Sequence, residues 1–171
     1  MAVICGYFFF ASFLSWMVVQ LHKRDWVKMP REDDFLNAVR GCDLKPGNYA
    51  FPGCESHEEM KSEAFQQKMK TGPSGFITVF ANNNMGKNLA YTFLYFFVVS
   101  FCLAYLGSLA LKPGAEFMPV FRFMSTAAFL TFLSAIVAHA IWFHCRIVGH
   151  IIETIVFAAI VGALFGLLWP A

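Results

Sequence analysis

The chain has 171 residues, of which 58% are hydrophobic, 18% aromatic and 14% charged, so its apolar fraction exceeds the roughly 45–50% typical of soluble domains. Its mean hydropathy of +0.56 and its long apolar blocks exclude intrinsic disorder and an ordinary water-soluble domain. A net charge of +2 is too small to indicate a nucleic-acid-binding protein. The composition therefore predicts an integral membrane protein.

Four apolar runs are each near or above the roughly 20 residues that an α-helix needs to cross the hydrocarbon core. They are Val3–Leu21, Leu89–Leu111, Phe117–Phe143 and Ile147–Leu168. Helices are expected because lipid offers no partner for unpaired backbone groups. We predict an all-α membrane protein with four transmembrane helices and one polar, partly helical segment between the first two.

The polar segment covers residues 22–88, between the first helix (1–21) and a three-helix transmembrane bundle (89–171). Pro30–Arg40 and Glu55–Lys70 are each predicted to be a helix, because apolar side chains fall on one face of each. Between them, Pro-Gly pairs at 46–47 and 52–53 predict a tight loop. Phe76–Phe80 fits either a short strand or an interfacial stretch. With few aliphatic residues, the segment is not expected to have a sizeable core of its own, and we expect it to pack against the membrane helices.

The chain is expected to be a multi-pass protein of the inner (plasma) membrane. Lys23, Arg24, Lys28 and Arg31 follow the first apolar run, so the positive-inside rule predicts that residues 22–88 are cytoplasmic and that both termini are outside. Cys42 and Cys54 both lie in the polar segment, where a disulfide is conceivable only if that segment faces an oxidising compartment.

Three histidines lie close to the turn between the last two predicted helices. His139 and His150 flank this turn, with His144 inside it, and two imidazoles on different helices are typical ligands of a transmembrane haem. The alternative is that these histidines contact headgroups, water or a neighbouring helix. No cofactor and no metal site are expected, with haem on His139 and His150 as the alternative.

Two charged residues fall inside the predicted spans. Glu153 is the sole acid in the last span and lies three residues after His150, on the same helical face. Intramembrane acids are rare and suggest function, so Glu153 is either a structural hydrogen-bonding residue or a proton or ligand site. An ionised carboxylate there needs a partner such as His150, Arg146 or a water-filled cavity, and otherwise it stays protonated. Arg122 lies about one turn into the third span and can extend to the interface.

Small residues recur every four positions on the last three spans, and we expect these stripes to pack inside the bundle. They are Ser100, Ala104 and Ser108; Ala127, Thr131 and Ala135; and Thr154, Ala158, Gly162 and Gly166.

Motifs of common enzymes are absent, including phosphate-binding glycine loops, nucleophile elbows and zinc-protease helices. A zinc site on Cys54 and His57 is a minor alternative that would need further ligands such as Cys42 and His22.

Three short motifs resemble a family of small, uncharacterised four-helix bacterial membrane proteins with no assigned activity. They are Trp16 with His22 at the end of the first span, Gly47-Asn48-Tyr49-Ala50-Phe51-Pro52, and Gly162-x-x-x-Gly166-Leu-Leu-Trp169-Pro170. An acidic position in the last helix of that family matches Glu153. The resemblance implies a membrane protein and assigns no catalytic residue.

The function expected from the sequence is that of a non-catalytic accessory or assembly subunit of a larger membrane protein complex, with lipid and other integral membrane proteins as partners. The first alternative is a small haem- or cofactor-binding redox protein that uses His139 and His150. The second is a small transporter with Glu153 as its proton or ligand site.

Overall fold

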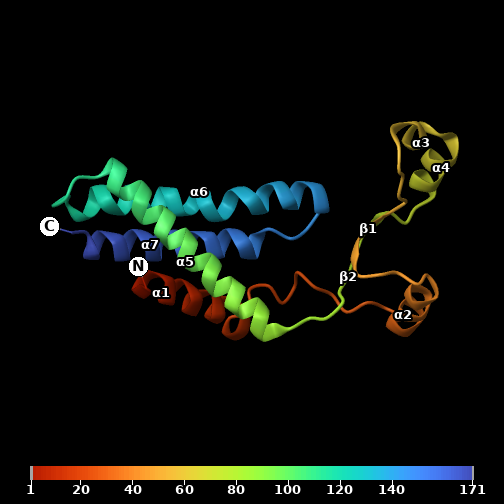
Figure 1. Cartoon of the computed structure of the whole chain (residues 1–171), viewed down its shortest axis with the longest axis horizontal. Coiled ribbons are helices and arrows are strands. Elements are labelled where there is room, and N and C mark those ends of the chain that lie inside the picture. Colours follow the sequence, from red (N-terminus) through yellow and green to blue (C-terminus); the bar gives the residue numbers. More distant parts are fainter. Residues whose placement is uncertain (1, 171) are drawn as a thin grey trace. The chain divides into compact units, whose positions relative to one another are not determined.

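The computed structural model describes residues 2–170, which form two compact units. The first unit is a helical bundle built from the described residues on either side of the second unit, Lys28–Asn84. Its helices are α1 (Ala2–Phe13), continued by a π-helix (Leu14–Val18), then α5 (Met85–Ala110), α6 (Phe117–Phe143) and α7 (Val148–Leu168) (Figure 1).

Three helices of the bundle, α5, α6 and α7, are long and apolar enough to cross a membrane, which suggests a membrane protein. The first apolar helix is shorter, so the prediction of four spans is not confirmed. Helix formation ends at Val18, three residues before the predicted boundary, and Gln20 has a positive φ of 54°. The backbone N–H of Leu21 then donates back to the carbonyl of Ser15, which turns the chain towards α7.

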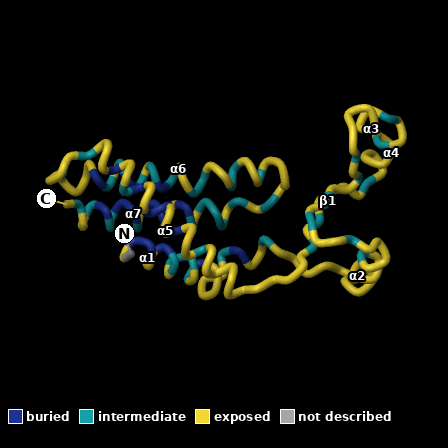
Figure 2. Tube along the Cα trace, in the orientation of Figure 1, coloured by how far each residue is buried: buried dark blue, intermediate teal, exposed yellow. Residues whose placement is uncertain are grey.

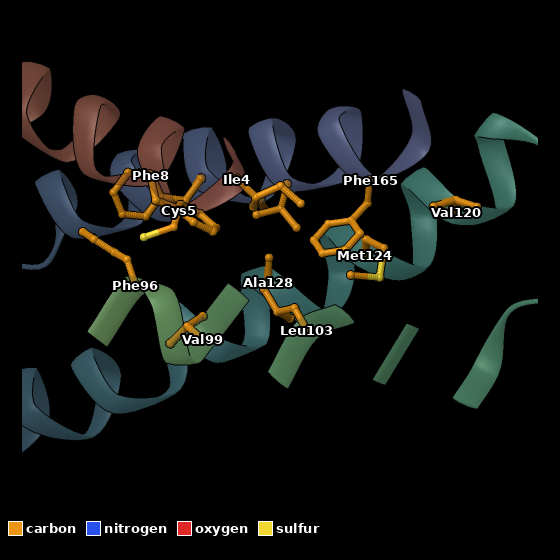
Figure 3. Close-up of a cluster of buried hydrophobic side chains, with 13 residues drawn as sticks. Ile4, Cys5, Phe8, Phe96, Val99, Leu103, Val120, Met124, Ala128 and Phe165 are labelled. Atoms are coloured by element: carbon orange, nitrogen blue, oxygen red, sulfur yellow. The ribbon is translucent and has the colours of Figure 1, made fainter. Parts of the chain in front are cut away.

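The core of the bundle lies where side chains from α1, α5, α6 and α7 meet (Figure 3). Phe8 of α1 is fully buried, and its ring lies 5.6 Å from Phe96 of α5, 5.3 Å from Phe132 of α6 and 5.6 Å from Phe157 of α7. Such aromatic pairs stabilise a core beyond their buried area. One phenylalanine therefore joins the short first helix to the three longer ones.

Small residues on α7 allow α6 to approach closely, as expected from the stripe of small residues on this span. A Cβ atom on Gly162 would lie 2.8 Å from the ring of Phe121, and one on Gly166 would lie 2.6 Å from the ring of Phe117. Thr154 and Ala158, earlier in the same stripe, are buried. The stripe on α7 thus packs inside the bundle.

The second unit contains a two-stranded antiparallel sheet and three short helices. Its elements are α2 (Glu32–Gly41), β1 (Gly47–Phe51), α3 (His57–Lys61), α4 (Glu63–Thr71) and β2 (Gly75–Val79), with Tyr49 opposite Ile77 in the sheet. The helix expected at Glu55–Lys70 is instead two helices, because the hydroxyl of Ser62 accepts a hydrogen bond from the backbone N–H of Phe65 and starts a new helix. The expected loop around Tyr49 is a strand, and the stretch at Phe76 is its partner.

No residue of Lys28–Asn84 is buried (Figure 2), in agreement with the expectation that this segment lacks a sizeable core. Cys42 and Cys54 lie in this unit, and both are free thiols.

A larger side chain at Gly162 is expected to separate α6 from α7. Gly162→Leu places four additional carbons against Phe121, whereas Gly6→Leu on α1 adds them where no atom lies within 4 Å. We expect the first variant to lose about 1–3 kcal/mol of stability and the second to lose much less. Thermal unfolding in detergent, followed by circular dichroism, measures the difference. Equal melting temperatures for the two variants would contradict this packing.

Candidate functional site

Four ionisable side chains meet where the chain leaves the first helix and α7 begins. His22 and Asp25 lie in the turn that follows the π-helix, and His150 and Glu153 lie in the first two turns of α7. We call these four residues the histidine–carboxylate cluster. All four belong to the helical bundle, although 125 positions separate Asp25 from His150 in the sequence (150 minus 25).

Close contact between His22 and Gly149 holds the turn against α7. A Cβ atom at position 149 would lie 3.2 Å from the Cε1 and Nδ1 atoms of His22 and from the carbonyl oxygen of Leu21. On its other side, the ring of His22 stacks on Trp16 at 4.1 Å between centroids. Backbone hydrogen bonds from Lys23 to Gln20 and from Asp25 to His22 close the turn. A glycine and a tryptophan therefore fix the position of this imidazole.

The imidazole of His22 lies between two carboxylates. Its Nδ1 is 2.7 Å from Oδ2 of Asp25, and its Nε2 is 3.3 Å from Oε2 of Glu153. The side chain of His22 is only 2% exposed, and those of Asp25 and Glu153 are 13% and 12% exposed. Hydrogen bonds shielded from water to this degree are electrostatically stronger than exposed ones. The arrangement thus orients both ring nitrogens of His22.

A guanidinium group and a second imidazole face Asp25. Nε of Arg146 and Nε2 of His150 each lie 3.9 Å from a carboxylate oxygen of Asp25, and the ring of His150 is 4.3 Å from that of His22. Arg146 is 58% exposed, and Glu153 contacts His22 instead. A bound cation would therefore add compensating charge to the cluster.

One oxygen of Glu153 has no hydrogen-bond partner among the described residues. Its Oε1 is buried, while Oε2 contacts His22. Leaving a buried acceptor unpaired costs about 1–3 kcal/mol, and more when it is charged. A buried acceptor of this kind pairs with an ordered water or an ion, or serves a catalytic role.

Three members of the cluster can ligate a single metal ion. One nitrogen from each of His22 and His150 and one oxygen of Asp25 all lie within 4.8 Å of one another. Ligands of one zinc ion are roughly 3–3.5 Å apart, given bond lengths of about 2.0–2.2 Å. A small movement of the side chains would therefore complete a site with two histidines and one carboxylate.

No protein-family model, curated protein or solved structure matches this chain. Only the geometry of its own residues therefore points to a function.

The structure places the predicted site residues in different surroundings. Glu153 and His150 both belong to the cluster, and the contact of Glu153 is with His22. His139 stacks on Phe143 at 4.5 Å and is not among the three ligating residues. Arg122 is exposed on α6 and forms no ion pair with a described residue. Haem ligation by His139 and His150 stays a prediction.

The sequence analysis missed Asp25 altogether and considered His22 only as a zinc ligand of the polar segment and in a motif with Trp16. Both were assigned to the start of that segment, because charged residues surround them. The available signal was their spacing: a histidine and an aspartate three positions apart, directly after an apolar helix. This spacing resembles that of His150 and Glu153, but only the fold brings the two pairs together.

Removing the imidazole of His22 is expected to destabilise the bundle. His22→Ala leaves two largely buried carboxylates without their shared partner, so we expect a loss of about 2–3 kcal/mol. His144→Ala is the matched control, since His144 is exposed in the turn after α6. Melting temperatures in detergent measure both effects. If both variants melt like the wild type, the cluster does not hold the turn.

Proposed function

We propose that this chain is a membrane protein that binds one divalent transition-metal ion through His22, Asp25 and His150. The observation that supports this most directly is the convergence of three ligating atoms within 4.8 Å, two of them from one turn and one from a distant helix. The function rests on this site because it combines burial, metal-ligating groups and an unpaired acceptor.

The ligand set favours zinc or iron(II) over magnesium or calcium. Imidazole suits Zn²⁺, Fe²⁺ and their first-row neighbours, whereas Mg²⁺ and Ca²⁺ prefer oxygen ligands. Two histidines with one carboxylate are found both in catalytic zinc sites and in non-haem iron sites. In both classes the protein leaves part of the coordination sphere to water or another molecule.

Glu153 has a supporting role in this proposal. Since its Oε2 lies 3.3 Å from Nε2 of His22, this carboxylate accepts a hydrogen bond from that nitrogen while Nδ1 faces the ion. A carboxylate behind a metal-bound histidine fixes its tautomer and raises its basicity. The two carboxylates of the cluster also favour a cation electrostatically.

Metal binding is tested with Co²⁺ as a spectroscopic substitute for zinc. Purified wild-type protein in detergent is expected to bind one equivalent and to show d–d absorption that Zn²⁺ abolishes and Mg²⁺ leaves unchanged. His22→Ala, Asp25→Asn and His150→Ala should each weaken binding at least tenfold, because each removes a ligand.

His144→Ala and His139→Ala serve as controls and should bind Co²⁺ like the wild type. Metal content is measured in parallel by mass spectrometry after dialysis. Wild-type protein that binds no Co²⁺ or Zn²⁺, or variants of the three ligands that bind both ions normally, would refute the proposal.

The place of the chain in the membrane extends this proposal. We propose that α1 and its π-helix form a fourth membrane-embedded helix, supported by the burial of Ile4, Cys5 and Phe8 in the core of the bundle. The inner membrane and the cytoplasmic position of the residues after this helix stay proposals from the charge pattern. The accessory-subunit role also stays a prediction, and stoichiometric co-purification of another membrane protein is its test.

A further inference from the structure

Arg146 faces the histidine–carboxylate cluster from outside the helices. It lies in residues 144–147, the non-helical link between α6 and α7. Its Nε atom is 3.9 Å from Oδ1 of Asp25, and its side chain is 58% exposed. An arginine side chain stays protonated in proteins. A permanent positive charge therefore faces a carboxylate that is proposed to ligate the metal ion.

The contact between Arg146 and Asp25 is an ion pair without a hydrogen bond. Its N···O distance of 3.9 Å exceeds the roughly 2.7–3.2 Å of an N–H···O hydrogen bond. A hydrogen-bonded partner would orient the carboxylate and so strengthen metal binding. A positive charge at this distance instead repels a cation that approaches the same carboxylate. The geometry thus predicts that Arg146 weakens metal binding.

The two oxygens of Asp25 face different groups. Oδ2 lies 2.7 Å from Nδ1 of His22 and 3.9 Å from Nε2 of His150, whereas Oδ1 faces Arg146. An ion held by the three ligating residues and the guanidinium group of Arg146 would therefore share one carboxylate. The negative charge of Asp25 cannot offset both of them fully.

We propose that Arg146 is a built-in counter-charge that competes with the metal ion for Asp25 and keeps binding of the ion reversible. This inference rests on the proposed metal-binding function and concerns how tightly that site holds its ion. In the ion-free protein the guanidinium group offsets the charge of Asp25. In the ion-bound protein it repels the ion, so the site loads and releases the ion instead of holding it permanently.

A cavity of about 170 Å³ borders the cluster at His150 and Glu153. Its lining contains neither Asp25 nor His22, so it gives access to only one of the three proposed ligands. The approach to Asp25 from water instead leads past the exposed side chain of Arg146. Arg146 is therefore placed to act on the ion at the side where it enters and leaves.

The expected size of the effect follows from Coulomb's law. The 3.9 Å ion-pair distance and metal–oxygen bonds of about 2 Å place the guanidinium group roughly 6–8 Å from the ion. At this separation, and with a dielectric constant close to that of water, a single and a double positive charge repel each other enough to weaken binding about five- to tenfold.

The test measures the Co²⁺ affinity of the full-length protein in detergent at low ionic strength. Arg146→Gln removes the charge and is expected to bind Co²⁺ about five- to tenfold more tightly than the wild type and to release it more slowly to a chelator. Arg146→Lys keeps the charge and should bind Co²⁺ like the wild type. Because Arg146 is exposed, neither variant is expected to disturb folding.

Two controls separate the charge of Arg146 from a structural effect. Lys112→Gln removes the same charge at the other end of α6, a helix of 27 residues that is about 40 Å long, and should leave the affinity unchanged. At an ionic strength of about 1 M the Debye length is about 3 Å, so the gain in Arg146→Gln should largely disappear. A structural effect would persist in salt.

The outcomes separate this inference from the metal site itself. Arg146→Gln that binds Co²⁺ no more tightly than the wild type refutes the counter-charge and leaves the metal site standing. An equal gain in Arg146→Lys or in Lys112→Gln, or a gain that salt does not reduce, also refutes it. Absence of Co²⁺ binding in the wild type refutes the metal site and this inference together.

Discussion

The contact between His22 and Gly149 is the constraint on which the rest of the site depends. Because position 149 has no side chain, the ring of His22 and the carbonyl of Leu21 approach the backbone of α7 directly. That approach requires the chain to leave its first helix early, and the positive φ of Gln20 and the hydrogen bond from Leu21 to Ser15 accomplish this. The short length of the first helix and the formation of the cluster thus have one cause. A fully extended first span would carry His22 along the helix axis instead of onto α7.

Polar and apolar groups are separated along the bundle. Phe8 and its aromatic neighbours form the core, while the two carboxylates of the cluster lie at the end of the bundle where α7 begins. Arg146 is exposed at the edge of the cluster, so its guanidinium group keeps its hydration, whereas His22 is enclosed. The free-energy cost of removing charged groups from water is limited in this way. The cavity lies between these two regions and has walls of both kinds. Its wall combines aromatic rings with the hydroxyl groups of Ser12 and Thr154 and with the ionisable groups of His150 and Glu153.

Hydropathy predicted much of the bundle but little of the site. The third span was predicted with the bounds that the structure shows, Phe117–Phe143, since a long apolar run has few structural alternatives. The helix expected at Glu55–Lys70 failed because a serine cap at Ser62 outweighed the apolar periodicity. Glu153 was found from the sequence, since an acid in an apolar span is rare. Its contact with His22 was not, because the two lie 131 positions apart and no periodic pattern encodes that pairing.

Under the proposed assignment, His150 has a particular place, because it is the metal ligand that also lines the cavity. Asp25 lies beside the exposed Arg146, so an ion would arrive from the aqueous end of the cluster. His22 is 2% exposed and is held through its other ring nitrogen by Glu153, so the ion would meet its most firmly positioned ligand last.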